Sequence, residues 1–300
     1  MLPRVGSLYT LSYTRMNRYE PVAPPAAAPS HAPPDGLHIR HLHTRDDFVA
    51  CVALQHETWG ADFSERVPAA ILKVSQRLGG VSAGAFDARE RLVGFVFGIT
   101  GVEHGRLVHW SDMLAVRPEL RDHGIGRRLK QFQREALLQL GVGTVYWTFD
   151  PLVARNAHFN LNRLGVRVTE YVIDMYGSDT DSALHRGLGT DRFIVAWDIG
   201  AQDTPDRREA TSTARVLNAS DGDGIPTTPR FRAAPARAPL RVEIPLEIHT
   251  VQDASLDLAG RWRTTTRAAF TWALEQGYHV AGFYRDAQAA RGYYILSRKT

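Results

Sequence analysis

Apolar and polar positions alternate along residues 37–200 in segments that predict strands and helices in turn. The runs 81–86 and 92–99 are strand-like and are joined by the polar stretch DARER, which predicts an antiparallel hairpin. A further strand is expected at 109–116. After it, apolar residues recur at the spacing of one helix face, and Gly141 marks the end of that helix. These positions are Ile125, Leu129, Phe132, Ala136 and Leu140.

Local signals at the segment ends define the remaining elements. Thr44 followed three residues later by Asp47 is a capping-box pattern, so we expect a helix that starts there and ends near Trp59. The other expected elements are a strand at 37–43, helices at 68–78 and 156–164, and strands at 144–149, 166–173 and 192–197. The order is strand, two helices, three strands, helix, strand, helix and two strands, which is typical of an α+β fold.

Two stretches are rich in residues that do not form a core. Residues 1–36 end in PVAPPAAAPSHAPPDG, which predicts a flexible leader, and translation could begin at Met16. Residues 201–239 are rich in Asp, Thr, Ala, Arg, Gly and Pro, which predicts a flexible linker. The linker separates a main block, 37–200, from a second block, 240–300, with a strand-helix-hairpin pattern. Because so short a segment seldom provides its own core, we expect the second block to pack on the main block or on a partner subunit.

The composition is that of an ordinary globular protein. Of 300 residues, 44% are hydrophobic and 23% are charged, which excludes a wholly disordered chain. No apolar run is long enough to span a bilayer and the first residues contain no signal-peptide core, so we expect a cytoplasmic protein with no membrane partner. The single cysteine, Cys51, cannot form an internal disulfide, and the 12 histidines lack the spacing of a metal site.

The excess of positive charge lies in one short segment. The net charge is +4, and residues 117–134 contain six basic and two acidic residues, so this segment accounts for the whole excess. A nucleic-acid-binding protein usually spreads its basic residues along a face or a tail. We therefore expect a compact polyphosphate ligand and no nucleic-acid partner.

A glycine-containing helix start lies inside this basic segment. In Arg-Asp-His-Gly-Ile-Gly-Arg-Arg, residues 121–128, Gly124 and Gly126 occupy the junction between a strand and a helix. Free amides at a helix N-terminus bind phosphate oxygens, and glycines let a diphosphate approach the backbone closely. Arg121 and Arg127 supply matching charge. The pattern is neither a P-loop nor a Rossmann fingerprint. A plain turn followed by an Arg-rich, solvated helix is the alternative.

With the element order and the later stretch Arg-Asn-Ala-His-Phe-Asn-Leu-Asn-Arg-Leu-Gly at 155–165, this helix start resembles the GNAT superfamily of acyl-CoA-dependent N-acyltransferases over roughly residues 37–200. The phrases VEIP, WRxxTRxAF and GYxVxGF in the second block are similar to those of a poorly characterised branch of predicted acetyltransferases. The resemblance implies a mixed, mostly antiparallel sheet flanked by helices, with a small α+β C-terminal extension. It also implies acetyl-CoA or another acyl-CoA as co-substrate, no metal, and a small-molecule or peptide amine as acceptor. By position, the residues implied for CoA binding are Met113, Leu114, Ala115, Val116, Arg121, His123, Gly124, Ile125, Gly126, Arg127, Asn156 and Phe159.

The catalytic groups are less complete than the implied binding site. Many members of the family protonate the departing thiolate with a tyrosine, and the matching position here is Leu161, which has no proton to give. For the base that deprotonates the amine, Asp112 is the first candidate, because a charge within an apolar strand is costly unless it is paired or useful. A satisfied structural carboxylate is the alternative. Asp150, at the end of the next strand, is the second candidate, with a helix cap as its alternative.

Acceptor contacts are implied at the end of the first helix, at Glu57 and Trp59, with a core position as the alternative for Trp59. His109 and His123 lie beside the implied site, where a histidine relays a proton or contacts phosphate. In the second block, Arg263 and Arg267 lie one helical turn apart, either to grip an anionic acceptor or on a solvated helix face. The alternative function is a catalytically silent CoA-binding regulatory or scaffold module. The sequence leaves the acceptor, the acyl length and the formation of a homo-oligomer open.

Overall fold

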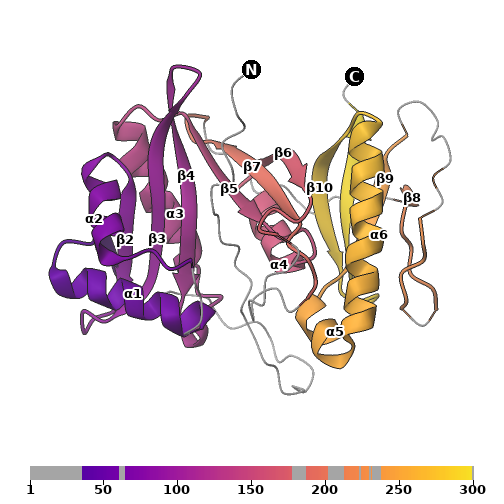
Figure 1. The fold of residues 1–300 in the computed structure, drawn as a ribbon, viewed down its shortest axis with the longest axis horizontal. Helices are drawn as coiled ribbons and strands as arrows, with labels where there is room; N and C mark the ends of the chain where they lie inside the picture. Colours follow the sequence, from indigo (N-terminus) through magenta and orange to yellow (C-terminus); the bar gives the residue numbers. More distant parts are fainter. Residues whose placement is uncertain are drawn as a thin grey trace.

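The computed structural model describes residues 36–60, 65–177, 187–201, 213–222, 224–229, 231 and 238–298. These residues form a seven-stranded and a four-stranded sheet with helices packed on them (Figure 1). Apart from Gly36, the expected leader, including Met16, lies outside the described residues.

The main block follows the predicted order of elements. They are β1 (His38–His41), α1 (Arg45–Trp59), α2 (Ala69–Arg77), β2 (Val81–Phe86), β3 (Leu92–Glu103), β4 (Arg106–Val116), the short helix η1 (Pro118–Leu120), α3 (Ile125–Gln139), β5 (Thr144–Phe149), α4 (Ala154–Ala157), η2 (His158–Arg163), β6 (Arg167–Val172) and β7 (Arg192–Asp198). At the start of α1, Thr44 Oγ1 accepts a hydrogen bond from the Asp47 amide at 3.1 Å, and the Asp47 carboxylate accepts one from the Thr44 amide at 3.1 Å. The predicted capping box is confirmed.

The large sheet has the order β1-β2-β3-β4-β5-β7-β6, and every neighbouring pair is antiparallel except β4 and β5. This confirms the predicted mixed, mostly antiparallel sheet flanked by helices. Leu114 and Leu129 belong to the core under α3, and Met113 belongs to the core under α1 and α2, so helices cover both faces. The parallel pairing of β4 with β5 covers only Val108 to Trp110 of β4, and beyond Trp110 the two strands separate.

The helix predicted at 156–164 has an unexpected geometry. Only α4 is α-helical, and η2 is a π-helix in which the Leu164 amide donates to the Phe159 carbonyl, five residues back, at 3.0 Å. Two asparagine side chains are anchored to other elements. Asn160 Oδ1 accepts from Trp147 Nε1 at 3.1 Å, and Asn162 Nδ2 donates to the Phe283 carbonyl at 2.9 Å. These hydrogen bonds to distant elements accompany the wider turn of the π-helix, which the spacing of apolar residues does not predict.

The second block, together with β8 from the expected linker, forms the smaller sheet, in the order β10-β11-β9-β8. Its elements are β8 (Arg215–Val216), β9 (Leu240–Pro245), α5 (Ile248–Ala254), α6 (Leu256–Glu275), β10 (Tyr278–Asp286) and β11 (Arg291–Arg298). The helix α5 was not predicted. β8 lies inside the expected linker 201–239, pairs with β9, and is followed by Asn218, whose buried side chain donates to the Glu243 carbonyl at 2.9 Å. This part of the expected linker is therefore folded, because its hydrogen-bond partners lie on a distant strand.

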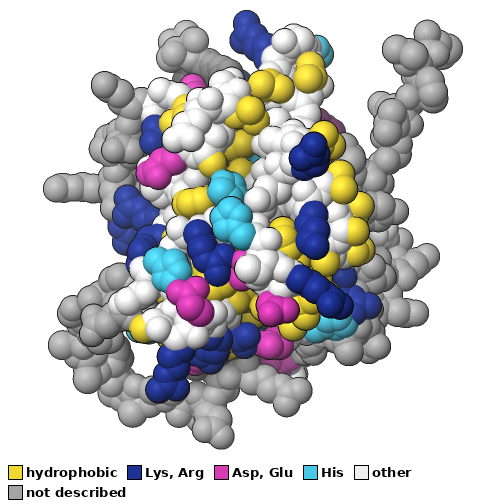
Figure 2. Space-filling view, turned by 90° about the vertical axis from the view of Figure 1, so that its left-hand side faces the viewer, with side chains coloured by type: hydrophobic (Ala, Val, Ile, Leu, Met, Phe, Trp, Pro, Cys, Tyr) yellow, Lys and Arg dark blue, Asp and Glu magenta, His cyan; other side chains and the backbone are white. Residues whose placement is uncertain are grey.

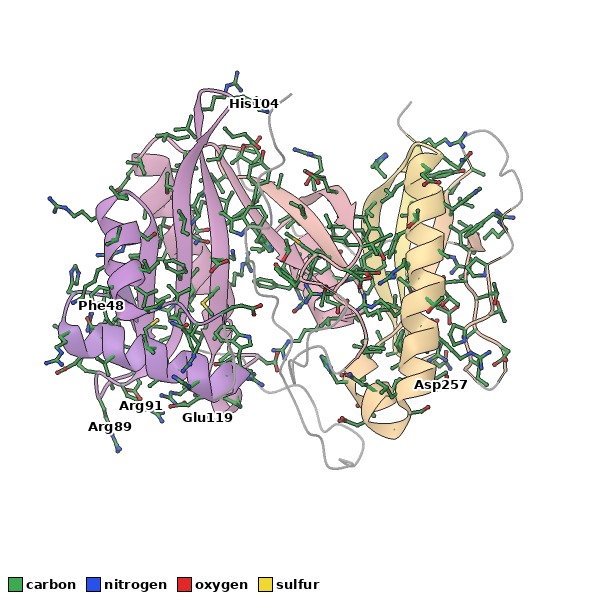
Figure 3. All side chains as sticks on the ribbon, viewed as in Figure 1. Phe48, Arg89, Arg91, His104, Glu119 and Asp257 are labelled. Atoms are coloured by element: carbon green, nitrogen blue, oxygen red, sulfur yellow. The ribbon has the colours of Figure 1, made fainter. Side chains whose placement is uncertain are left out.

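The two blocks share one hydrophobic core. The ring of Phe193 in β7 packs edge to face on Phe270 of α6, with centroids 4.8 Å apart, and on Tyr294 of β11, 5.6 Å apart. The Tyr294 hydroxyl donates to the Pro151 carbonyl at 2.7 Å. Side chains fill the layer between β6 and β7 on one side and β10 and β11 on the other (Figure 3). The second block therefore covers apolar surface that the main block would otherwise expose.

The side of the molecule that carries α1 and α2 has a mixed surface. Basic, acidic and apolar side chains are interspersed over this face (Figure 2). Val49 of α1 and Ile71 and Val74 of α2 are exposed apolar residues on these helices. The basic residues on this face therefore do not form one continuous stripe.

Candidate functional site

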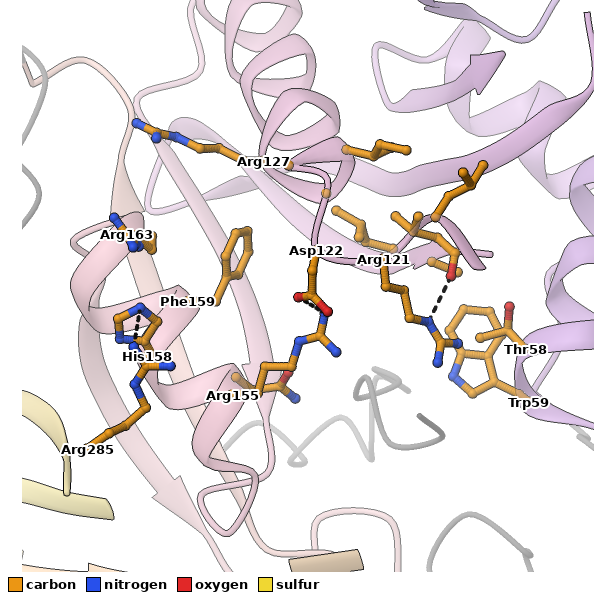
Figure 4. A pocket seen from close by; sticks show the side chains of 18 residues that line it. Thr58, Trp59, Arg121, Asp122, Arg127, Arg155, His158, Phe159, Arg163 and Arg285 are labelled. Carbon is orange, nitrogen blue, oxygen red and sulfur yellow. Dashed lines mark hydrogen bonds and ion pairs between the residues drawn. The ribbon is translucent and has the colours of Figure 1, made fainter. Parts of the chain in front are cut away.

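A cavity of about 790 Å³ opens at the N-terminus of α3 (Figure 4). Its walls come from the end of α1, the second half of β4, the start of α3, and α4 with η2, and β10 of the second block adds Arg285. Cavities of this size accommodate a cofactor-sized ligand. Ten of the twelve residues predicted to bind CoA line it. They are Leu114, Ala115, Val116, Arg121, Gly124, Ile125, Gly126, Arg127, Asn156 and Phe159.

The glycine turn at the start of α3 forms part of the cavity wall. Gly124 is the N-cap residue and has a left-handed φ of 74°, which side chains rarely adopt. An added Cβ at Gly126 would meet only Leu114 Cδ2, at an ordinary contact distance of 3.6 Å. Glycine within a helix costs roughly 1 kcal/mol relative to alanine, and packing does not require it here. Gly124 has no side chain that could cap this helix, and in the part of the chain that the structure describes the first amides remain available to an anion.

Arginine side chains from separate parts of the chain surround this turn. They are Arg121, Arg127, Arg155, Arg163 and Arg285. Among the described lining residues, Asp122 is the one acid, and its carboxylate lies 2.7 Å from Arg155 Nη2. Burial, together with the charge of Arg155, lowers the pKa of Arg121 to about 10. The cavity therefore gathers five arginines around the start of α3.

The basic segment 117–134 contributes less to the cavity than its sequence suggests. Of its six basic residues, Arg121 and Arg127 line the cavity. Lys130 is fully buried on the sheet side of α3, with Nζ 2.7 Å from Ser111 Oγ and 4.0 Å from the centre of the Trp147 ring. Burial lowers the pKa of Lys130 to about 7. The other three bind elsewhere: Arg117 to Glu57, Arg128 to the Leu37 carbonyl and Arg134 to the Ile199 carbonyl.

Asn156 lines the cavity and has a buried polar group, Nδ2, that no described residue satisfies. Its side chain is 8% exposed, and among the described residues nothing accepts a hydrogen bond from Nδ2. A buried unsatisfied donor costs roughly 1–3 kcal/mol, and an acceptor on a ligand would remove that cost. Phe159 lies nearby and turns its ring toward the cavity (Figure 4).

Beyond Trp110, no described strand pairs with the edge of β4 that lies beside the cavity. Its pairing with β5 ends at Trp110, and its pairing with β3 skips Asp112, which is the extra residue of a β-bulge. After the bulge, Leu114 and Val116 point to the α3 face and line the cavity. The Met113 side chain, predicted to bind CoA through its backbone, lies on the opposite face and is not among the lining residues.

Asp112 has a carboxyl group with a shifted pKa. The residue is 9% exposed, and the described residues provide no hydrogen bond to its carboxylate. Burial, together with the charge of Glu65, raises the pKa of Asp112 to about 7. Asp112 is not among the cavity-lining residues and lies two residues before Leu114, which is. A carboxylate that titrates near neutral pH is suited to accept a proton from an amine.

Asp150 is engaged on both oxygens. Oδ1 accepts from the Leu152 amide at 2.8 Å, and Oδ2 lies 2.5 Å from Arg263 Nη2 and 3.6 Å from Arg192 Nη1. Burial acts to raise the pKa of Asp150, but the charges of Arg263 and Arg192 hold it below its usual value. These contacts give Asp150 an ion-pairing role and a role in the turn 150–152, and it does not cap α4, whose N-cap is Val153, so we retain Asp112 as the candidate base.

The predicted acceptor residues differ in their surroundings. Glu57 is exposed, pairs with Arg117 and is not among the lining residues. Trp59 occupies the core position that was its alternative, because it is 3% exposed and packs edge to face on Phe95 with centroids 6.0 Å apart, and it also lines the cavity.

The two histidines expected beside the site do not line the cavity. His123 Nδ1 donates to the Arg121 carbonyl at 2.7 Å. His109 is fully buried between Thr100 and Gln133, and burial lowers its pKa to about 3, so it remains neutral. Leu161, at the position of the family's tyrosine, is 4% exposed and belongs to the hydrophobic core.

The surroundings of Arg263 and Arg267 differ from both predicted roles, a grip on an anionic acceptor and a solvated helix face. Arg263 is 5% exposed and binds Asp150, and Arg267 Nη2 lies 2.6 Å from Asp191 Oδ1 and 2.8 Å from Asp174 Oδ1. Both side chains join the second block to the main block. Their partners are distant in sequence, so the helix alone gives no signal of them.

The sequence predicted no role for five residues: four basic residues that line the cavity, and one acidic residue near Asp112. Arg155, His158 and Arg163 lie in the stretch 155–165, so their charge is a signal that could have been read. Arg285 carries no local signal, because folding alone brings it to the cavity. Glu65 is not among the lining residues, and folding brings its charge close enough to raise the pKa of Asp112.

Two general features concern the described part of the chain. No group of three or more His, Cys, Asp or Glu side chains is placed to hold a metal ion. No helix in this part is both long and apolar enough to cross a membrane.

No protein-family model and no curated protein matches the chain. Solved structures match it over about half of its length. The ribosomal-protein-S18-alanine N-acetyltransferase from Escherichia coli is 18% identical, with 56% of this chain and 97% of that chain covered and a TM-score of 0.42. An N-acetyltransferase from Staphylococcus aureus Mu50 is 13% identical, with 55% and 99% covered and a TM-score of 0.44. The aminoglycoside 6'-N-acetyltransferase from Enterococcus faecium is 17% identical, with 56% and 99% covered and a TM-score of 0.41. At these values the matches do not assign the chain to a family.

Proposed function

We propose that this chain is a GNAT-type N-acyltransferase that moves an acetyl or other short acyl group from acyl-CoA to an amine of a small molecule or peptide. The observation that carries the proposal is the open glycine turn at the start of α3, in a cavity with five arginines and beside a strand edge that pairs with no other described strand. An uncapped helix N-terminus with adjacent arginines suits a diphosphate.

The residues around the cavity fit the parts of CoA. The amides of Gly124 to Arg127 would bind the diphosphate, and the missing side chain at Gly126 leaves room for it. The edge of β4 beyond Trp110 would pair with the amide groups of the pantetheine arm as a strand does. Asn156 Nδ2 would donate to a carbonyl of that arm, which would satisfy a buried donor.

The proposed reaction forms a bond between the amine nitrogen and the acyl carbon and breaks the bond between that carbon and sulfur. Asp112 would accept the proton that the amine loses. Backbone amides at the β4 bulge are the proposed donors to the developing oxyanion. The thiolate would take its proton from solvent, because Leu161 has none to give.

A thiol-release assay with acetyl-CoA and a panel of amines tests the proposal, with calorimetry of CoA binding alongside. Amine-dependent release of free thiol, together with an acylated amine in the mass spectrum, is the expected result. Because Leu161 stands where the family's tyrosine would donate a proton, a second candidate is a CoA-binding module without turnover. Tight CoA binding with no release for any amine would support that candidate, and absence of CoA binding would refute both.

A further inference from the structure

A buried lysine lies where the strands β4 and β5 separate. Their parallel pairing ends at Trp110 and Tyr146. The next residue of each strand, Ser111 in β4 and Trp147 in β5, contacts Lys130 of α3. Nζ of this lysine lies 2.7 Å from Ser111 Oγ and 4.0 Å from the centre of the Trp147 ring. The lysine side chain therefore joins the two strands immediately beyond their last backbone pairing.

A second α3 side chain extends these contacts along β4. Lys130 Nζ also donates to Gln133 Oε1, at 3.3 Å, about one turn further along the helix. Gln133 Nε2 in turn lies 3.0 Å from His109 Nε2. The helix α3 therefore holds β4 through polar contacts at two positions, His109 and Ser111.

Packing alone does not account for a lysine at this position. Three of the other buried residues of α3 are apolar, namely Ile125, Leu129 and Leu137. Lys130 is 1% exposed, and taking an amine out of water is costly unless polar partners compensate. An apolar side chain would fill the same space without this cost, so the contacts that the lysine makes indicate a further role.

Ser111 immediately precedes the bulge of β4. The pairing of β4 with β3 includes Ser111 and Met113 but skips Asp112, so the ladder does not hold the bulge residue itself. On the other edge of β4, no described strand pairs beyond Trp110. Because backbone pairing is weak on both sides of Asp112, the side-chain contact of its neighbour Ser111 helps to determine where it lies.

We infer that Lys130 is a positioning residue, which joins Ser111 to Trp147 and so keeps the bulge of β4, with Asp112, in place for the reaction. This inference rests on the proposed function, in which Asp112 is the base. Neither Lys130 nor Ser111 is among the described residues that line the cavity, so Lys130 acts through the strand. Since reaction rates depend steeply on the alignment of the reacting groups, a displaced bulge lowers kcat while CoA binding is retained.

Steady-state kinetics of the full chain tests the inference, with acetyl-CoA, an amine that shows turnover in the thiol-release assay, and calorimetry of CoA binding. Lys130→Met keeps an unbranched side chain without the amine, and Ser111→Ala removes the hydroxyl. Each should lower kcat by about 10²-fold, with the KM for acetyl-CoA and the affinity for CoA unchanged. The double variant should fall no further than either single variant, because both remove the same contact.

Two serine variants serve as controls. Ser111→Thr retains the hydroxyl and should recover most of the kcat that Ser111→Ala loses. Ser82→Ala removes another buried hydroxyl of the same sheet, which donates to the Leu72 carbonyl at 2.9 Å, and should leave kcat unchanged. Denaturation curves give the folded fraction of each variant, and rates are expressed per folded molecule.

An unchanged kcat in Lys130→Met, or equal falls in Ser111→Ala and Ser82→Ala, would overturn the inference and leave the proposed function standing. Effects that multiply in the double variant would also overturn it, because the two side chains would then not act through one contact. If Lys130→Met does not fold, equal rates of Ser111→Ala and Ser111→Thr would overturn it. Wild-type protein without turnover for any amine would overturn the proposed function and, with it, the inference.

Discussion

Arg263 Nη2 lies 2.5 Å from Asp150 Oδ2, although the two residues are 113 positions apart in the chain. Both side chains are buried, and Arg192 lies 3.6 Å from the same carboxylate oxygen. The carboxylate therefore lies close to two buried guanidinium groups, one from each block. This arrangement makes the second block part of the same folded unit as the large sheet.

Asp150→Asn should lower the free energy of unfolding by about 3–5 kcal/mol, because it leaves Arg263 and Arg192 buried without their counter-charge. Urea denaturation measures the change. Arg261→Gln, on the exposed side of the same helix as Arg263, should change this free energy by less than about 0.5 kcal/mol. Equal stability of the two variants would contradict a role for this ion pair in joining the blocks.

Asp112→Asn should lower kcat/KM above pH 7 by about 10²–10⁴-fold, the usual contribution of a general base. In the wild-type protein, kcat/KM should fall as the pH drops below about 7, because a protonated Asp112 cannot accept the amine proton. A pH-rate profile measures both effects. Glu65→Gln removes one cause of the raised pKa, so it should shift the acidic limb to lower pH while the plateau rate is retained. An acidic limb that remains in Asp112→Asn would show that another group is the base.

The same carboxyl group should affect stability in a defined direction. Its pKa is about 7 in the folded chain and roughly 3.9 when unfolded, so the folded state retains a proton that the unfolded state has lost between these values. The stabilising contribution of the protonated Asp112 is therefore present at low pH and is lost as the pH rises to 7. Relative to the wild-type protein, Asp112→Asn should gain stability between pH 4 and pH 8 in urea denaturation.

Gly126→Ala should stabilise the protein by up to about 1 kcal/mol and at the same time weaken CoA binding. The added methyl group meets only an ordinary contact in the fold, but it occupies the space proposed for the diphosphate. Gly260→Ala in α6, where an added Cβ meets nothing within 4 Å, is the control that should stabilise to a similar degree and leave the affinity unchanged. Calorimetry that finds the same CoA affinity in both variants would refute the proposed diphosphate site.

Leu161→Met should leave thiol release per folded molecule unchanged, because Leu161 belongs to the core and is not among the cavity-lining residues. Leu161→Ala should lower the free energy of unfolding by about 2–5 kcal/mol through the cavity it leaves. Turnover normalised to the folded fraction separates the two effects. A ten-fold fall in turnover for a fully folded Leu161→Met would show that position 161 takes part in the reaction.

Local sequence signals alone determined the order of the elements and the position of two of their ends. The spacing of apolar residues predicted the order of strands and helices, Thr44 and Asp47 predicted the start of α1, and two glycines marked the turn at α3. Each of these signals acts within one turn or one hairpin, so it can be read without knowledge of the rest of the chain.

The tertiary structure decided the charges and partners of the site. It turned Lys130 into the core, engaged Asp150 with Arg263, converted the helix after α4 into a π-helix, and brought Arg285 from β10 to the cavity. It also folded β8 out of the expected linker. These outcomes depend on contacts between residues that are far apart in sequence. Burial and charge pairing, which set the role of an ionisable side chain, exist only when the chain has packed.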